Sequence, residues 1–341
     1  MIETRLANQV IEGDCRDILK RIADCSADLV LTSPPYYHQR DYGVTKGTIG
    51  QEENVDQYIK NLETVFRECL RVVKPSGSII FNLGDKYENE SLLLVPYRFA
   101  VRMLSCTEAK LLNVITWVKP NPQPRQFKRR LVSSTEPFFH FVKSPNYKYF
   151  PDKFNANDGS RISKANDQTR TGQGYFDLIR ASDLSQEQKD QAFKELEQVI
   201  MELKSGKITS FRMKIRGIHS AAYGGYEGGR KSHIESKGFT IIRMYGKPIK
   251  RDVIESPILN LRYVHHPAIY PERVVREIID LTTEVGDMVI DPFLGSGTTA
   301  VIAKQMGRRF IGIEISPEYC RIAEDRLRTA AAESIDLWIT R

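Results

Sequence analysis

Hydrophobic residues follow two alternating patterns along this chain. Short apolar runs suited to buried strands occur seven times, and between most of them apolar residues recur at three- and four-residue steps, as on amphipathic helices. The strand-like runs are residues 9–14, 28–32, 78–85, 111–119, 136–143, 287–293 and 309–315. The helix-like segments are residues 15–23, 55–73, 92–104, 272–283, 298–306 and 317–332. This alternation predicts an α/β protein with a doubly wound, mostly parallel seven-stranded sheet.

The middle of the chain breaks this pattern. Between residues 151 and 256 the sequence becomes rich in glycine, asparagine, aspartate and lysine, and it contains one clear helix. Ser185 precedes that helix and Gln188 follows three residues later, which is the capping-box pattern of a helix start. We therefore expect one domain formed by residues 1–150 and 257–341, interrupted by an insertion over residues 151–256.

Composition narrows the class of protein. The 341-residue chain is 41% hydrophobic, and no uninterrupted apolar run approaches the roughly 20 residues that a membrane-spanning helix needs. Its first residues lack the charged-then-apolar order of a secretory signal. The five cysteines lie far apart, without the C-x-x-C spacing of metal or redox sites. These features predict a cytoplasmic protein with reduced thiols, no membrane partner and no metal site.

The net charge of +7 is concentrated in two regions. Between residues 205 and 251, eleven lysines and arginines accompany only two glutamates, and a second basic cluster occupies residues 125–130. A run of basic residues is often only a solvated surface, but this concentration, interleaved with glycines and tyrosines, favours contact with nucleic acid. The basic residues assigned to this contact are Arg125, Lys128, Arg129, Arg130, Arg230, Lys231, Lys247, Lys250 and Arg251.

A glycine-rich turn joins the predicted strand 287–293 to the helix after it. The turn reads DPFLGSGTT from Asp291, so the backbone can approach a ligand closely and the helix start offers free N–H groups. Glu314, about twenty residues on at the end of the next strand, suits the diol of a ribose. This order favours a nucleoside site. No lysine follows the glycines, which argues against a P-loop, and Ala300 replaces the third glycine of a dinucleotide motif.

The predicted strand 28–32 ends in an unusual tip. It continues as Ser33-Pro34-Pro35-Tyr36, and the two prolines lack the N–H groups that a helix or a sheet would need. The serine hydroxyl and the Pro34 carbonyl can each accept a hydrogen bond from an N–H group of an exocyclic amine, while Tyr36 stacks on the ring that bears the amine. Taken alone, the residues fit equally well a hydrophobic turn that wedges the tyrosine.

Together, TSPPY at 32–36 and DPFLGSGTT at 291–299 resemble the two diagnostic motifs of the amino-group DNA methyltransferases, which use S-adenosylmethionine. The catalytic motif precedes the cofactor motif with a long insertion between them, an order that resembles the circularly permuted β-class of the family. Serine in place of aspartate in the tetrapeptide is similar to the N4-cytosine branch. The resemblance covers residues 1–150 and 257–341, and the insertion matches no pattern of the family.

The resemblance implies a Rossmann-like methyltransferase fold and specific roles for residues of both motifs. Ser33, Pro34, Pro35 and Tyr36 are the implied catalytic residues. The implied cofactor contacts are Asp14, His266, Pro267, Asp291, Pro292, Phe293, Gly295, Ser296, Gly297, Thr298 and Glu314. Tyr37 joins the basic residues in DNA contact, and residues 151–256 are the implied target-recognition region.

The expected reaction is direct, in-line methyl transfer to the amine of a cytosine flipped out of double-stranded DNA. No Pro-Cys dipeptide is present, which fits, because a carbon-5 cytosine methylase needs that thiolate. A separately encoded restriction endonuclease and a second copy of the chain are further partners to consider.

Three alternatives stay open from the sequence. N6-adenine methylation is a close one, since adenine also presents an amine beside a ring nitrogen. A catalytically silent DNA-binding protein would predict loss of the cofactor glycines or of the Ser-Pro-Pro-Tyr tip, and both are intact. An NAD-dependent oxidoreductase would not explain that tip.

Overall fold

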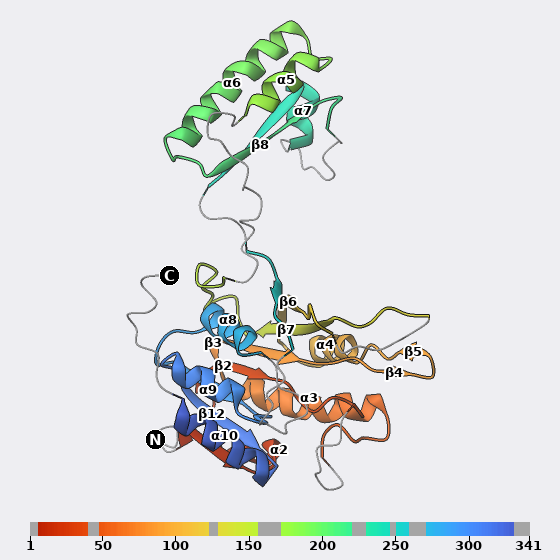
Figure 1. Ribbon diagram of the computed structural model, residues 1–341, viewed down its shortest axis with the longest axis vertical. Coiled ribbons are helices and arrows are strands. Elements are labelled where there is room, and N and C mark those ends of the chain that lie inside the picture. Colours follow the sequence, from red (N-terminus) through yellow and green to blue (C-terminus); the bar gives the residue numbers. More distant parts are fainter. Residues whose placement is uncertain are drawn as a thin grey trace. The chain divides into compact units, whose positions relative to one another are not determined.

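The computed structural model describes residues 6–39, 48–122, 129–155, 172–219, 230–245, 250–258 and 271–330. The chain divides into two compact units (Figure 1). The sheet unit combines Met1–Asn157 with Lys250–Arg341, and the small unit is Asp158–Ile249. The expected insertion, residues 151–256, therefore extends a few residues beyond the small unit at both ends. Phe154 is buried in the core of the sheet unit, which explains the difference at the first boundary.

An eight-stranded sheet forms the centre of the sheet unit. Its strands lie in the order β1-β12-β11-β2-β3-β7-β6-β10, and every neighbouring pair is parallel except the two pairs that β7 makes. The strands are β1 (Gln9–Glu12), β2 (Ala27–Thr32), β3 (Val73–Asn82), β6 (Lys110–Val118), β7 (Thr135–Val142), β10 (Val253–Glu255), β11 (Met288–Asp291) and β12 (Arg309–Glu314). The predicted doubly wound, mostly parallel sheet is confirmed.

The sheet contains one strand more than the pattern predicts. All seven expected strands are present, and β10 pairs with β6 at the edge, next to Thr116, Trp117 and Val118. This strand has three residues, too few to show a periodic pattern, and it falls in the stretch assigned to the insertion. It also explains why the small unit ends before residue 256.

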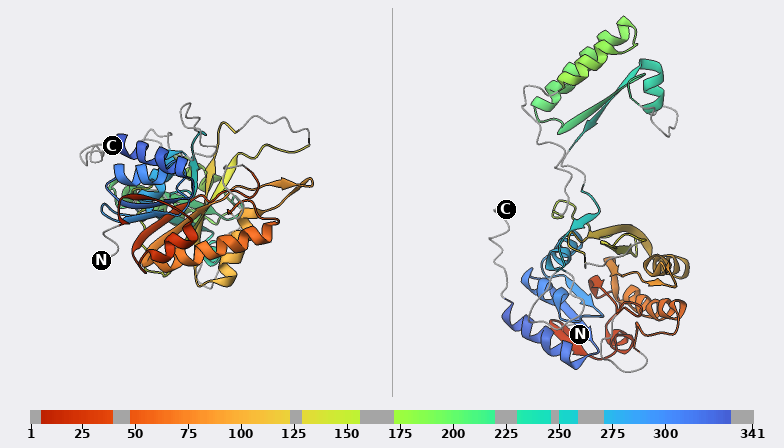
Figure 2. Two further views of the ribbon diagram at one scale, coloured as in Figure 1. Left: turned by 90° about the horizontal axis from the view of Figure 1, so that it is seen from below. Right: turned by 45° about the vertical axis from the view of Figure 1, so that its right-hand side comes forward.

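Helices cover both faces of the sheet (Figure 2). One face carries α2 (Cys15–Ile18), α3 (Val55–Val72) and α4 (Val95–Cys106), and the other carries α8 (Glu272–Thr282), α9 (Thr298–Gln305) and α10 (Pro317–Thr329). In β2, Val30 packs into the first of these two hydrophobic cores, whereas Leu29 and Leu31 pack into the second. A central strand buried on both faces reads as a continuous apolar run, as residues 28–32 do.

Two of the expected helical segments differ from the structure at more than their last residues. The segment 15–23 is the short helix α2 followed by a 3₁₀ turn, Leu19–Arg21. The segment 92–104 begins later, at Val95, because Ser91–Leu92 (β5) pairs with Tyr87–Glu88 (β4) in a separate hairpin.

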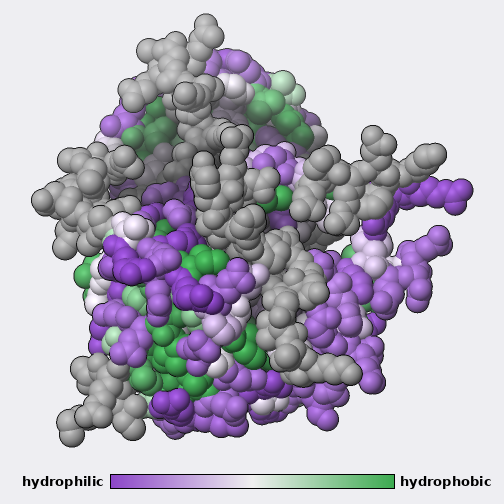
Figure 3. All heavy atoms as spheres, turned by 60° about the horizontal axis from the view of Figure 1, so that its bottom comes forward, coloured by the Kyte–Doolittle hydropathy of each residue, from purple (hydrophilic) through white to green (hydrophobic). Residues whose placement is uncertain are grey.

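The coloured residues on the face shown in Figure 3 are mainly hydrophilic, and the apolar residues among them form separate patches. Among the described residues, no helix combines the length and apolar character needed to cross a membrane.

The small unit has a hydrophobic core of its own. Its elements are α5 (Gln173–Ala181), α6 (Gln186–Lys204), β8 (Ser210–Ile215), α7 (Arg230–Lys237) and β9 (Phe239–Met244). The strands β8 and β9 form an antiparallel ribbon, and Met213, Ile215 and Phe239 pack against Ile179 and Leu196 of the helices. The predicted capping box at the start of α6 is confirmed.

Candidate active site

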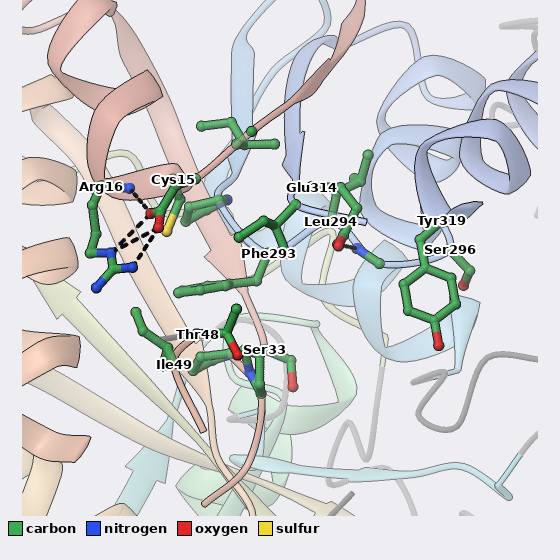
Figure 4. Close-up of a pocket in the computed structure, with 18 of the residues that line it drawn as sticks. Cys15, Arg16, Ser33, Thr48, Ile49, Phe293, Leu294, Ser296, Glu314 and Tyr319 are labelled. Carbon is green, nitrogen blue, oxygen red and sulfur yellow. Dashed lines mark hydrogen bonds and ion pairs between the residues drawn. The ribbon is translucent and has the colours of Figure 1, made fainter. Parts of the chain in front are cut away.

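A pocket lies at the carboxyl ends of β2, β11 and β12 (Figure 4). Both sequence motifs reach it, because β2 pairs directly with β11 although the two strands lie at opposite ends of the chain. The predicted residues that line it are Asp14, Ser33, Pro34, Pro35, Tyr36, Pro292, Phe293, Gly295, Ser296, Thr298 and Glu314. The structure therefore joins the predicted catalytic tip and the glycine-rich turn in one cavity.

Glu314 is held at the end of β12 by two backbone N–H groups. Its Oε2 accepts a hydrogen bond from the N–H of Gly295 at 2.8 Å, and its Oε1 accepts one from Ser316 at 2.9 Å. Burial raises the pKa of this carboxyl group, and these N–H donors act in the opposite direction. Each oxygen keeps a second lone pair, so the fixed carboxylate can still accept hydrogen bonds from a ribose diol.

Asp14 caps the start of α2 and is tied to Arg16. Its Oδ1 accepts from the backbone N–H of Arg16 at 2.8 Å, and the Arg16 guanidinium contacts both carboxylate oxygens. These hydrogen bonds hold the pKa of Asp14 below its usual value. Arg16 itself lines the pocket, and in Figure 4 the ring of Phe293 lies between Arg16 and Glu314. Arg16 was not predicted as a site residue, although a cation two residues after an acid was the available signal.

Asp291 does not line the pocket, unlike its predicted neighbours. The side chain is 3% exposed, and its Oδ1 accepts hydrogen bonds from the Thr32 hydroxyl at 2.6 Å and from the N–H of Phe293 at 3.1 Å. Burial raises its pKa to about 6. The structure thus gives Asp291 a different role from cofactor contact: it ties the tip of β11 to the tip of β2.

Gly297 also lies outside the pocket lining. Its φ is 88°, and a Cβ there would lie 2.8 Å from the Cβ of Ala323 in α10. Glycine is required here because α9 and α10 approach closely, whereas the sequence suggested that the backbone approaches a ligand. Nearby, Arg326 of α10 binds the Ser296 carbonyl at 2.7 Å and the Thr298 hydroxyl at 3.2 Å.

The Ser-Pro-Pro-Tyr tip is held by hydrogen bonds to residues at the ends of two neighbouring strands. The Tyr36 hydroxyl donates to Asn82 Oδ1 at 2.7 Å or to Glu136 Oε2 at 3.0 Å. The Ser33 Oγ lies 3.3 Å from both Asn82 Oδ1 and the Tyr36 Oη. The ring of Tyr36 packs on Gly84, where a Cβ would lie 2.4 Å from it. The Tyr36 ring is therefore fixed in orientation beside the Ser33 hydroxyl.

The two proline carbonyls differ in their surroundings. The Pro35 carbonyl accepts a hydrogen bond from the Tyr58 hydroxyl at 2.8 Å. The Pro34 carbonyl makes no hydrogen bond to any residue in the described ranges. Ser33 and Pro34 line the same pocket, so both acceptors that an exocyclic amine would need are present there.

Asn82 and Glu136 were not predicted as site residues. Asn82 ends β3, Glu136 lies at the start of β7, and the Asn82 amide N–H donates to the Pro137 carbonyl at 3.0 Å. Their proximity to Tyr36 follows from the order of strands in the sheet. The one local signal was a polar residue in the apolar run 78–85.

The residues predicted to contact DNA differ in how exposed they are and in the unit to which they belong. Tyr37 is 4% exposed and packs in the core, so it offers little surface to DNA. The Arg130 guanidinium lies 3.7 Å from the centre of the Tyr87 ring, and Arg129 and Arg251 are exposed. Lys250 is half-buried and, like Arg251, belongs to the sheet unit.

The remaining predicted contacts fall where the structure gives less detail. Arg230 and Lys231 lie in α7, in a part where only the backbone is described. The other predicted residues lie outside the described residues; they are Arg125, Lys128, Lys247, His266 and Pro267.

Comparison with known proteins defines the class. Residues 27–325 match the model of a DNA methylase family that covers N6 and N4 methyltransferases. The chain therefore belongs to this family of DNA methyltransferases, and the predicted resemblance is confirmed. Members of the family use S-adenosylmethionine.

Individual relatives agree with this assignment. The chain is 26% identical to the type II methyltransferase M.Cfr9I of Citrobacter freundii, over 94% of this chain and 87% of that protein. It is 27% identical to M.SfiI of Streptomyces fimbriatus, over 90% and 88%. A match of 41% identity to M.MwoI of Methanothermobacter wolfeii spans 40% of this chain and 21% of that protein.

Solved structures share the fold. The PvuII DNA methyltransferase, described as cytosine-N4-specific, superposes with a TM-score of 0.57 at 16% identity, over 97% of this chain and 89% of that one. A DNA modification methylase of Thermus thermophilus, solved in complex with S-adenosyl-L-methionine, gives a TM-score of 0.51 at 20% identity, over 94% and 92%. The sheet unit thus has the Rossmann-like methyltransferase fold.

Proposed function

We propose that this protein transfers a methyl group from S-adenosylmethionine to the exocyclic N4 amine of cytosine at a specific short DNA sequence. The observation that carries the proposal is one pocket holding both the Ser33-Pro34 acceptor pair and the glycine-rich turn with Glu314. Serine at the head of the tip favours cytosine over adenine, in line with the resemblance to the N4 branch. N6-adenine methylation is the second candidate, because the family includes both activities.

The residues of the pocket fit the cofactor. Glu314 provides a fixed carboxylate for the ribose diol, Phe293 an apolar face, and Asp14 a hydrogen-bond acceptor beside α2. When bound, S-adenosylmethionine supplies a methyl group on a positively charged sulfur, open to attack by a nucleophile. The acidic side chains at the pocket also suit a ligand that carries positive charge.

The catalytic tip activates the amine. The lone pair of a cytosine amine is delocalised into the ring, so the amine is a weak nucleophile. Ser33 Oγ and the Pro34 carbonyl accept hydrogen bonds from its two N–H groups and favour a pyramidal nitrogen with a free lone pair. Tyr36, held by Gly84 beneath and by its own hydroxyl, presents a ring on which a flipped base stacks.

The small unit is the proposed target-recognition region. It has its own hydrophobic core, and most of the basic cluster 205–251 belongs to it. The relatives named above are type II methyltransferases, so we further propose a restriction-modification role in the cytoplasm, with a separately encoded endonuclease as partner. The proposed assembly also includes a homodimer.

The proposal is tested by the product. The purified protein is incubated with labelled S-adenosylmethionine and genomic DNA, and the nucleosides are then separated by mass spectrometry. We expect N4-methylcytosine from the wild type and a strongly reduced yield from Ser33→Ala. If the product is N6-methyladenine, the substrate base is adenine and not cytosine. If the DNA remains unmethylated, the proposed activity is contradicted.

A further inference from the structure

A hydrogen-bonded path leads from the pocket to a carboxylate outside its lining. The Ser33 Oγ lies 3.3 Å from the Tyr36 Oη, which lies 3.0 Å from Oε2 of Glu136. Both hydrogen bonds run in the same sense, since Ser33 can donate to Tyr36 while Tyr36 donates to Glu136. Ser33 and Tyr36 line the pocket, and Glu136 lies behind them at the start of β7.

We propose that Ser33, Tyr36 and Glu136 form a relay that carries away the proton released by methyl transfer. The inference rests on the proposed function, because the reaction leaves a surplus proton on the substrate amine. A serine hydroxyl is too weak a base to take that proton, whereas a carboxylate can take it from the strongly acidic methylated amine and release it to water. Glu136 supplies the carboxylate that the tip itself lacks.

The proton balance defines the step. The bond from nitrogen to the methyl carbon forms as the bond from that carbon to sulfur breaks, and the electron pair stays on sulfur. The nitrogen then carries one methyl group, two protons and a positive charge. One proton passes to Ser33 Oγ, the Ser33 proton passes to Tyr36, and the Tyr36 proton passes to Glu136. Both hydroxyls are restored, and Glu136 becomes a neutral acid.

Other groups near the path do not accept the proton. Asn82 Oδ1 is closer to Tyr36, at 2.7 Å, but an amide oxygen is not a base at neutral pH. Asn82 is held by its N–H bond to the Pro137 carbonyl, and its oxygen accepts from Ser33 or Tyr36 only when that hydroxyl is not donating along the path. Any carboxylate suffices as acceptor, because a methylated amine whose charge cannot spread into the ring is a far stronger acid than a carboxylic acid.

Lys119 orients the carboxylate without joining the path. Its ammonium forms an ion pair with Oε1 of Glu136 and lies 4.5 Å from the centre of the Trp117 ring, which leaves Oε2 for Tyr36. The Lys119 and Glu136 side chains are 13% and 17% exposed. This partial exposure gives the proton a route from Glu136 to water after each reaction.

The test compares two conservative variants and their combination. Glu136→Gln keeps an oxygen acceptor for Tyr36 but removes the charge, and Tyr36→Phe keeps the ring but removes the hydroxyl. With DNA that the wild type methylates, each should slow single-turnover methyl transfer on the order of tenfold to a hundredfold. The double variant should be no slower than the single ones, because either change interrupts the same path. Affinities for DNA and cofactor should stay near the wild-type values.

Lys119→Met is the matched control, since it removes the ion pair and keeps the carboxylate. It should slow the reaction much less than Glu136→Gln does; an equal loss would mean that the ion pair, and not the carboxylate, matters. A readout without turnover is the carbon-13 signal of Cζ in Tyr36 of the free protein, assigned by its absence from Tyr36→Phe. This signal should move more in Glu136→Gln than in Lys119→Met.

The outcomes separate the relay from the proposed function. A wild type that methylates no DNA base overturns both. If the wild type is active and Glu136→Gln transfers the methyl group at the wild-type rate, the relay alone is overturned. The same holds if the rate losses of the two single variants multiply in the double variant. Methylation of adenine instead of cytosine, with the pattern above, supports the relay and changes only the base.

Discussion

At Gly297, an added side chain would collide with a neighbouring helix before it could affect the pocket. The backbone there has a positive φ, and the Cα and Cβ of Ala323 lie within 3.0 Å of where a Cβ would stand. A glycine in a ligand-binding motif can therefore serve helix packing. The effect of replacing it should appear first in stability.

We expect Gly297→Ala to lower the free energy of unfolding by about 1–3 kcal/mol, through overpacking and backbone strain. Ala323→Gly in the same chain should recover part of this loss, so that the double variant is less destabilised than the sum of the single variants by about 1 kcal/mol. Urea denaturation measures this. Wild-type stability combined with lost cofactor affinity would restore the view that Gly297 serves ligand approach.

His140 illustrates a buried titratable residue remote from catalysis. It is fully buried between β3 and β6, its Nε2 lies 2.8 Å from the Ser78 hydroxyl, and its Nδ1 has no partner among the described residues. Burial lowers its pKa from 6.5 to about 4. The folded protein therefore holds this imidazole neutral where the unfolded chain would protonate it.

The sign of the pH effect follows. Between pH 6.5 and 4 the unfolded chain binds a proton that the folded protein does not, so the free energy of unfolding should fall as the pH falls. The total from His140 is about 3 kcal/mol. His140→Gln should flatten this dependence relative to wild type in urea titrations at a series of pH values. Parallel curves for the two proteins would contradict the prediction.

The order of the strands in the sheet determines where the site lies. Thr32 ends β2, Asp291 ends β11, and their hydrogen bond joins two tips that lie 259 positions apart in sequence. Parallel strands bring their carboxyl ends to one edge, which is where ligands bind in sheets of this type. In the small unit, one face of the antiparallel ribbon of β8 and β9 packs on the helices.

The other face of the ribbon carries Arg212 and Lys214, which alternate with the buried Met213 and Ile215. Neither cation forms an ion pair with a described residue, whereas Arg243 pairs with Glu202 at 2.6 Å. A two-stranded ribbon fits a DNA major groove, and basic side chains on it would contact phosphates.

Reversing both charges, in Arg212→Glu with Lys214→Glu, should weaken DNA binding and reduce the slope of log affinity against log salt by about two. Cofactor affinity should not change. Lys194→Glu with Lys204→Glu, on exposed positions of α6, provides a control with the same change in net charge. Equal effects of the two pairs would show that net charge alone determines the binding.

Much of this arrangement could be predicted from sequence, and the exceptions have physical reasons. The seven strands and the order of helices follow from local periodicity, which the chain expresses strongly. Glu136 could not be assigned to the site, because its contact with Tyr36 depends on β7 lying antiparallel beside β3, a long-range pairing. Gly297 was assigned to the turn because of ligand approach, and its contact with Ala323 could not be foreseen, since Ala323 lies in another helix.

For the whole molecule, the separate cores of the two units suggest separate stability. The small unit packs Ile179, Leu196, Met213 and Phe239 together, and none of these belongs to the two cores of the sheet unit. A chain in which Asp158–Ile249 is replaced by a Gly/Ser linker, of about ten residues, should therefore fold and bind S-adenosylmethionine with near wild-type affinity.

The same deletion should remove sequence-specific DNA binding. Calorimetric titration with the cofactor and competition between target and random DNA measure the two properties. A deleted chain that still prefers its target sequence would contradict the role given to the small unit.

The position of the small unit within the chain has a consequence for how such proteins diversify. It is one continuous stretch, and the residues that flank it are secured in the sheet unit by Phe154 on one side and by β10 on the other. Exchange of a single gene segment could therefore replace the small unit without altering the strand tips where β2 meets β11. With the small unit in its proposed role of target recognition, such an exchange would give a lineage new DNA targets while the chemistry is inherited unchanged.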